Sequence, residues 1–264
     1  MAKIVTITQN KGGCGKTTTA ANMGAALRLQ GLDVLLLDLD GQANLTASLG
    51  VTPDGSTTYD AIKNPRGYIE PVRILGPEGK TCGVLDLLAA CGDLSAVEGE
   101  LSREPDKRDR MGVFLALYGD KYDVILIDTP PALGLLTINA LYCADETIIT
   151  VQPQYLAVSG LMQLTEAIDT VNTARRVPLD RRVLFTMYDN RKGLHRLTVE
   201  QVAASGFPTF TAKIRDNVAL GEAPALGVDI FRYSPRSKGA EDYAALCAEW
   251  MKQAKIKHRN HGHK

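Results

Sequence analysis

The stretch that decides the fold is TQNKGGCGKTTTA, residues 8–20, which lies between an apolar run and a helix-like segment. It nearly matches the phosphate-binding pattern G-x-x-x-x-G-K-[ST], which ends here in Gly15, Lys16 and Thr17. The first position of that pattern is Asn10 instead of glycine, and a second lysine, Lys11, follows it. The sequence therefore predicts a nucleotide phosphate site that carries one additional cation.

Each residue type in this loop suits phosphate chemistry. Glycines allow the backbone to pass close to phosphate groups, which bind to its N–H groups and to the helix N-terminus. Lys16 would reach the β- and γ-phosphates, and the Thr17 hydroxyl would bind Mg²⁺. The small Cys14 fills the variable position, and a redox role for its thiol is left open. The predicted ATP-binding residues of the loop are Lys11, Gly12, Gly13, Cys14, Gly15, Lys16, Thr17 and Thr18, and the family resemblance given below adds Met187.

Aspartates end two further apolar runs. In VILIDTPP the apolar run ends at Asp128, and a carboxylate at this position can orient Mg²⁺ or its water. LLLDLDGQANLT carries Asp38 and Asp40, whose spacing of two directs both side chains the same way. We expect Asp40 to hold the attacking water and Asp38 to support Mg²⁺ or Lys16. The predicted metal ligands are therefore Thr17, Asp38 and Asp128.

Strand-like and helix-like segments alternate along the chain. Continuous apolar runs predict buried strands at residues 3–8, 33–40, 83–89, 122–129, 146–152 and 181–188. Helices are predicted at residues 17–30, 133–143, 158–174, 194–205 and 240–254. The alternation predicts an α/β fold: a doubly wound, mostly parallel sheet with helices on both faces, of the P-loop NTPase type.

The sequence is consistent with one domain. Its 264 residues contain no internal repeat and no linker long enough to divide them, so residues 1–264 are interpreted as a single ATPase domain. Residues 53–82 look irregular, and residues 103–110 look like a charged loop or a helix start. Residues 255–264 are basic and are interpreted as a flexible tail.

The amino-acid composition indicates the cellular compartment in which the protein is expected. The five scattered cysteines indicate reduced intracellular thiols, and the sequence shows neither a signal peptide nor an apolar run of the ~20 residues that a membrane span needs. We therefore expect a cytoplasmic protein without membrane binding. Residues 1–174 carry 13 Lys/Arg against 21 Asp/Glu, whereas residues 175–264 carry 17 against 9. This asymmetry is compatible with a basic face for a polyanion or with an ordinary solvated surface.

Several segments together resemble a known family. KGGCGKTT, DLDGQANLT and ILIDTPPALGLLTINAL resemble the deviant Walker A, A′ and B motifs of the ParA/MinD ATPases. TMYDNR, GEAPALG and SKGAEDY resemble the short, Soj-like ParA branch that partitions chromosomes and plasmids. The resemblance runs nearly end to end.

The resemblance implies a role for the additional lysine. In this family the first lysine of K-G-G-x-G-K crosses the interface of an ATP-bound homodimer and touches the partner's phosphates, and Lys11 matches that position. Such a cation acts like an arginine finger that the other subunit supplies. The catalytic residues implied for this chain are Lys11, Lys16 and Asp40, with ATP and Mg²⁺ as cofactors.

The resemblance also implies partners. Soj-like proteins bind double-stranded DNA nonspecifically through basic residues, and a ParB-like protein activates their weak basal hydrolysis. Such a protein would be associated with the nucleoid. The candidate DNA-binding residues are Arg191, Arg215, Arg236 and Lys238, and their binding should weaken steeply with salt.

The sequence departs from the family pattern at two places. The usual D-x-D-P-Q-G-N has Gly41 in place of proline and Ala43 in place of glycine. The usual I-P-R-N-V near the adenine is represented by residues 213–218, KIRDNV, without the proline.

Two alternatives remain open at the level of sequence. One is an ATP-switched positioning adaptor whose cargo is a protein assembly. The other is a reductase like the nitrogenase iron protein, which would need two cysteines per subunit to bridge a cluster. Cys91 and Cys143 are the only plausible pair for that role.

Overall fold

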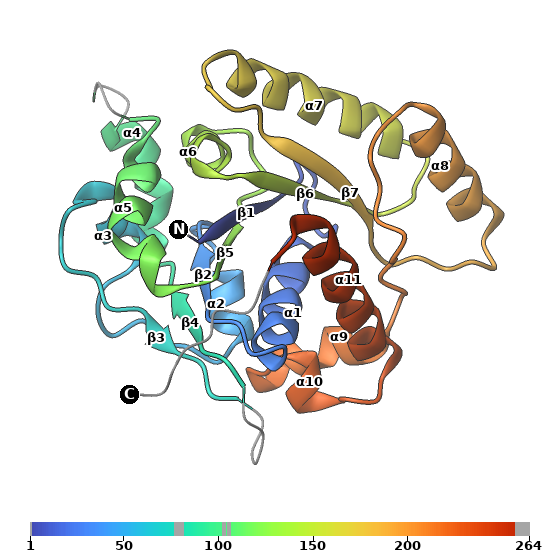
Figure 1. Ribbon diagram of the computed structural model, residues 1–264, viewed down its shortest axis with the longest axis horizontal. Helices are drawn as coiled ribbons and strands as arrows, with labels where there is room; N and C mark the ends of the chain where they lie inside the picture. The colour runs from blue at the N-terminus through green and yellow to red at the C-terminus, as the bar shows by residue number, and fades with distance from the viewer. Residues whose placement is uncertain (1, 77–81, 102–103, 105–106, 257–264) are drawn as a thin grey trace.

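A single sheet organises the chain (Figure 1). The computed structural model describes residues 2–76, 82–101, 104 and 107–256. Within these residues a seven-stranded sheet has the order β3-β4-β2-β5-β1-β6-β7. The strands are β1 (Lys3–Thr8), β2 (Val34–Asp38), β3 (Val72–Arg73), β4 (Leu85–Leu88), β5 (Val124–Asp128), β6 (Glu146–Val151) and β7 (Asp180–Phe185).

All neighbouring strands are parallel except β3, which pairs antiparallel with β4 at the edge. β1 lies between β5 and β6, and Ile7 is in register with both Asp128 and Ile148. Asp38 of β2 is in register with Asp128 of β5. The P-loop and two of the predicted carboxylates therefore leave the sheet side by side at its carboxyl edge, where open α/β sheets bind ligands.

Helices connect the strands and cover the sheet. The longer ones are α1 (Lys16–Leu29), α5 (Arg110–Tyr118), α6 (Leu135–Cys143), α7 (Ala157–Thr173), α8 (Gly193–Ala204) and α11 (Lys238–Ala254). The short ones are α2 (Asn44–Ser48), α3 (Thr58–Lys63), η1 (Gly92–Ala96), α4 (Val97–Leu101), η2 (Gly119–Lys121), α9 (Val218–Glu222), η3 (Ala223–Leu226) and α10 (Ile230–Tyr233).

Alternate strand residues face opposite layers, as a period of two requires. Val34 and Leu36 of β2 pack in one cluster with residues of α1 and α11, including Trp250. Leu35 and Leu37 of the same strand pack on the opposite face, against residues of α3, α5 and α6. A third cluster joins β6 and β7 to α7 and α8. Both faces of the sheet are thus buried, which confirms the doubly wound α/β fold.

Each of the six predicted strands is present, and each of the five predicted helices is present with bounds shifted by at most two residues. Gly31 has φ 83°, as expected for a glycine that ends a helix. The expectation for residues 53–82 was incomplete, because this segment contains α3 and β3. Arg110 begins α5, which extends to Tyr118.

Among the described residues, no helix combines the length and the apolar character that crossing a bilayer requires. Most of the predicted basic tail, residues 257–264, lies outside the described residues. Lys255 has φ 53° and ends α11.

Candidate active site

The P-loop connects β1 to α1 through glycines in left-handed conformations. Gly13 has φ 70° and Gly15 has φ 85°, and Gly15 is the N-cap of α1. A Cβ atom at Gly15 would lie 3.4 Å from Cγ2 of Thr186. Glycine is therefore favoured at Gly15 by its backbone conformation, while a Cβ atom there would make only an ordinary contact with Thr186.

The carbonyl of Lys11 accepts two hydrogen bonds from side chains of the same loop. The buried Cys14 thiol donates to this carbonyl at 3.0 Å, and Nζ of Lys16 donates to it at 3.4 Å. The Cys14 sulfur also lies 3.3 Å from Oγ1 of Thr150, and Thr186 donates to the Cys14 carbonyl at 2.8 Å. Because the thiol points into the protein, Cys14 can offer a phosphate only its backbone N–H.

A cavity of about 290 Å³ opens over the loop and the start of α1. It brings together residues from four separate segments, including Asp40 after β2, Pro131 after β5 and Met187 after β7. Met187 itself has φ 50°, an uncommon conformation for a side chain of this size. The lining residues are Gly12, Gly13, Gly15, Lys16, Thr17, Thr18, Asp40, Asn44, Pro131 and Met187.

Thr17, on the wall of this cavity, is bonded to Asp128 at the end of β5. Oγ1 of Thr17 donates to Oδ2 of Asp128 at 2.7 Å, and Oδ1 of Asp128 is buried without a hydrogen-bond partner among the described residues. Burial, together with the charge of Asp38, raises the pKa of Asp128 to about 8. A hydroxyl beside a buried carboxylate oxygen with a free lone pair fits Mg²⁺, which uses one or two carboxylates together with phosphate oxygens and water.

Asp38 has a different set of partners. Its Oδ2 accepts hydrogen bonds from the backbone N–H and the hydroxyl of Thr46 at 2.9 Å and 2.7 Å. Its Oδ1 accepts one from the N–H of Asp40 at 3.2 Å. Burial raises the pKa of Asp38 to about 6. The observed role of Asp38 is thus to anchor the segment around Asp40, and its role as a magnesium ligand stays a prediction.

Asp40 lies in the loop that carries Gly41 and Ala43, the two substitutions in the first segment that departs from the family pattern. Its Oδ1 accepts a hydrogen bond from the N–H of Gln42 at 3.0 Å. Ala43 has φ 52° and is the N-cap of α2, so an alanine occupies a left-handed position that suits glycine. The backbone of this loop therefore still adopts the conformation for which the family's usual glycine is suited.

A second cavity of about 210 Å³ adjoins the first and shares Gly15, Thr18 and Met187 with it. Its far wall comes from the KIRDNV segment and α9, including Ile214, Asp216 and Leu220. Asn217 lies in the same wall and caps α9 by accepting from the N–H of Ala219 at 2.9 Å. The position beside the phosphate cavity suits the base of a nucleotide, and the sequence had indicated only the segment and not these contacts.

Comparison with known proteins agrees with this geometry. A family model described as an AAA domain matches residues 2–180. The chain is 38% identical over 259 residues to the chromosome partitioning protein ParA of Myxococcus xanthus, covering 96% of this chain and 89% of that one. It is 38% identical over 253 residues to the sporulation initiation inhibitor protein Soj of Bacillus subtilis, covering 94% and 98%.

This chain belongs to the ParA/MinD family. It falls on the Soj-like branch, and two of its relatives, from Myxococcus xanthus and Treponema pallidum, are named for chromosome partitioning. The structure is also similar to that of cobyrinic acid a,c-diamide synthase from Mycobacterium smegmatis with a bound ATP analogue and magnesium. That likeness has a TM-score of 0.81 at 30% identity and covers 97% of this chain and 96% of the other. This ParA/MinD protein is therefore a P-loop ATPase, and its relatives support nucleotide and magnesium binding.

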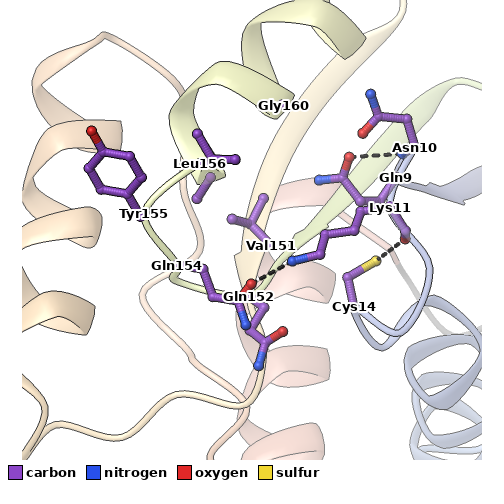
Figure 2. A pocket seen from close by; sticks show the side chains of 11 residues that line it. Gln9, Asn10, Lys11, Cys14, Val151, Gln152, Gln154, Tyr155, Leu156 and Gly160 are labelled. Carbon is purple, nitrogen blue, oxygen red and sulfur yellow. Dashed lines mark hydrogen bonds between the residues drawn. The ribbon is translucent and has the colours of Figure 1, made fainter.

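The additional lysine of the ParA/MinD motif lines a different cavity from the phosphate site (Figure 2). There a cavity of about 260 Å³ separates the loop from the segment between β6 and α7. The exposed Lys11 donates from Nζ to Oε1 of Gln154 across this cavity. Tyr155, next in the chain, is 86% exposed. In this structure Lys11 is thus directed away from the phosphate cavity of its own chain.

Three of the four candidate DNA-binding residues lie together. Arg191, Arg215 and Lys238 line one polar groove of about 430 Å³, whereas Arg236 is exposed outside that lining. Nε and Nη2 of Arg191 each donate to the carboxylate of Asp189 at 3.0 Å, which lowers the pKa of Asp189 to about 2. Part of the positive charge at Arg191 is therefore compensated within the same turn.

Arg215 is fixed by the start of α11, in the SKGAEDY segment typical of this family branch. Its guanidinium donates to the Asp242 carboxylate at 2.7 Å and to Glu241 at 3.1 Å. The side chain of Ser237 caps α11, and the Tyr243 hydroxyl lies 3.2 Å from Oγ1 of Thr19 in α1. The segment therefore joins the groove to the helix that follows the P-loop.

The two cysteines considered for a bridging cluster have ordinary local contacts. The Cys143 thiol donates to the carbonyl of Ala140 within α6, and the Cys91 sulfur lies 3.6 Å from Oγ1 of Thr57. In the part of the chain that the structure describes, no group of three or more His, Cys, Asp or Glu side chains is arranged to hold a metal ion. Membership of the Soj-like branch favours the partition class over the reductase.

Proposed function

We propose that this chain is an ATP-dependent DNA partition ATPase, in which the ATP-bound homodimer binds double-stranded DNA nonspecifically. The observation that carries the proposal is that two residues form a wall shared by two neighbouring cavities. Arg215 and Asp216 line both the cavity beside the phosphate site and the polar groove that holds Arg191 and Lys238. A nucleotide in the first cavity can therefore alter the position of groups that face DNA in the second.

The proposed reaction uses the residues at the carboxyl edge of the sheet. Lys16 binds the phosphates of its own nucleotide, and Asp40 orients the attacking water. Mg²⁺, held by Thr17 and Asp128 with Asp38 in support, would neutralise phosphate charge. Lys11 supplies a second cation to the partner's nucleotide, so hydrolysis depends on dimerisation.

The proposed cycle places the whole chain, residues 1–264, in one ATPase domain of the cytoplasm, associated with the nucleoid and not with membranes. Basal hydrolysis is weak, and a ParB-like activator stimulates it and thereby releases the dimer from DNA. The partition relatives of this chain support this cycle, since they are 34–38% identical to it over most of its length.

A gel-shift experiment with a nonspecific duplex tests DNA binding. We expect a shift with ATP and Mg²⁺ and little or none with ADP, and we expect it to weaken steeply as salt rises, because phosphate contacts release counterions. Lys16→Ala is the matched control, since it removes nucleotide binding and leaves the groove intact. If ATP produces no shift at low salt, the positioning adaptor with a protein cargo becomes the better hypothesis.

A further inference from the structure

Helix α6 lacks a side-chain cap of its own. Its N-cap is Gly134, and the first turn contains no acidic residue. Instead, the N–H of Leu136 donates at 3.0 Å to Oε1 of Glu98, which comes from α4. A Cβ atom at Gly134 would lie 2.3 Å from the same oxygen, so the carboxylate rests directly against the backbone of the helix start. A negative charge at this end of a helix is favourable.

The start of α6 belongs to the loop that closes the phosphate cavity. That loop leaves β5 after Asp128 and carries Pro131 on the cavity wall. It is anchored before the wall by Thr129, which donates to the Ile7 carbonyl at 2.9 Å. It is anchored after the wall by Thr137, which donates to the Ala132 carbonyl at 2.6 Å. Glu98 adds an attachment at the start of α6 that comes from α4.

The segment that carries Glu98 also touches the other catalytic loop. Ser95 of η1 packs against Gly41, the residue after Asp40. A Cβ atom at Gly41 would lie 2.1 Å from Oγ of Ser95 and 3.0 Å from its backbone nitrogen. The glycine that replaces the family's usual proline therefore permits this contact. One short segment, residues 92–101, bridges the loops that follow β2 and β5.

We propose that Glu98 is a positioning residue for ATP hydrolysis. By capping α6 while its segment contacts Gly41, it fixes the loop after Asp128 relative to the loop that carries Asp40. Glu98 lines neither the phosphate cavity nor the cavity beside it, and it acts only through the backbone of α6. Its loss would therefore slow turnover and leave ground-state nucleotide binding, which the P-loop supplies, unchanged. This inference rests on the ATPase activity proposed above.

The test measures single-turnover phosphate release and nucleotide affinity in the full chain. Glu98→Ala should lower the hydrolysis rate roughly tenfold, which corresponds to about 1.4 kcal/mol in the barrier. Its affinity for a non-hydrolysable ATP analogue, measured by calorimetry, should equal that of the wild type. Glu98→Gln should recover most of the rate, because its amide oxygen can still accept from the Leu136 N–H.

Glu100→Ala is the matched control. Glu100 lies in the same short helix, but its carboxylate binds Lys63 at 2.6 Å and Tyr59 at 3.2 Å, away from α6. It should hydrolyse ATP at the wild-type rate. An equal rate loss in Glu100→Ala, or a Glu98→Ala variant that loses affinity together with rate, would indicate general disruption of α4 and overturn the positioning role.

The ATPase activity of the wild-type protein distinguishes a failure of the proposed function from a failure of this inference. A wild type that hydrolyses no ATP with Mg²⁺ and duplex DNA overturns the proposed function and this inference together. An active wild type with an unchanged Glu98→Ala variant overturns only the inference. Thermal melting of each variant shows whether it is folded, and the Glu98→Gln rate decides the question if Glu98→Ala does not fold.

Discussion

Asp40 is the more accessible of the two aspartates at the end of β2. It lies on the wall of the phosphate cavity, whereas the neighbouring Asp38 is buried and bonded to Thr46. A carboxylate that is only partly engaged by its own chain can accept a proton from water or orient it. The different roles that we propose for the two aspartates agree with the depth at which each lies.

We predict that Asp40→Ala binds ATP with near-normal affinity but releases phosphate at least about a hundredfold more slowly, since general-base positioning typically contributes 10²–10⁴-fold. ATP-bound dimers should then accumulate. Calorimetry and single-turnover phosphate release measure the two quantities. Phosphate release at the wild-type rate would remove Asp40 from the mechanism.

A second prediction concerns the groove. Asp189 binds Arg191 through two hydrogen bonds of 3.0 Å, so Asp189→Asn should leave more of the arginine charge available to DNA phosphates. We expect roughly threefold to tenfold tighter duplex binding with ATP and a steeper dependence on salt. Fluorescence anisotropy at several salt concentrations measures both.

Arg191→Ala provides the opposing control and should weaken binding. Weaker binding by Asp189→Asn would mean that the carboxylate holds the arginine in its productive position. That result would reverse the role given to Asp189 here.

The residues of the loop were predictable because their chemistry is local. Gly13, Gly15, Lys16 and Thr17 act within one turn, and the pattern of residue types therefore names them. The Glu98 contact with Leu136 was not predictable, because packing of α4 against α6 brings together residues 38 positions apart. The Asp189–Arg191 pair could have been proposed from its spacing of two, but only the structure shows that the side chains meet.

At the scale of elements, strands were predicted well because buried parallel strands are continuously apolar. β3 escaped prediction because Val72–Arg73 is short, lies at the edge and contains a charge. α3 was not predicted for a similar reason, since only Thr58, Ala61 and Ile62 of its six residues are buried. Short elements at the periphery have too few buried positions to show a period.

The glycine turn that follows α2 packs against the glycine turn that follows η3. Gly50 has φ 71° and Gly227 has φ 66°, and a Cβ atom at Gly227 would lie 2.6 Å from Cα of Gly50. We predict that Gly227→Ala lowers the free energy of unfolding by about 2–4 kcal/mol, because left-handed strain and overpacking add together. Denaturant unfolding measures the loss.

Gly206→Ala is the matched control for that substitution. Gly206 has φ 78°, but a Cβ atom there would meet nothing within 4 Å. It should lose only about 1–2 kcal/mol, the part due to backbone strain. Equal losses in the two variants would show that the contact between the turns contributes nothing.

At the scale of the whole molecule, the proposed dimer depends on Lys11. We predict that Lys11→Ala retains ATP binding but stays monomeric with ATP, because the phosphates of each nucleotide lose the cation from the partner. Light scattering with ATP and Mg²⁺ measures the mass. Lys16→Ala should instead lose nucleotide binding itself, and a full Lys11→Ala dimer would contradict the crossing lysine.

The hydrogen bond between Lys11 and Gln154 has an energetic consequence. An ammonium group that is already bound within its own chain exchanges that partner for the phosphates of a second molecule when the proposed dimer forms. The dimer therefore gains only the difference between the two interactions, and a side-chain hydrogen bond contributes about 1 kcal/mol. The amide of Gln154 would thus compete with the partner's nucleotide and weaken the ATP-bound dimer by up to about fivefold.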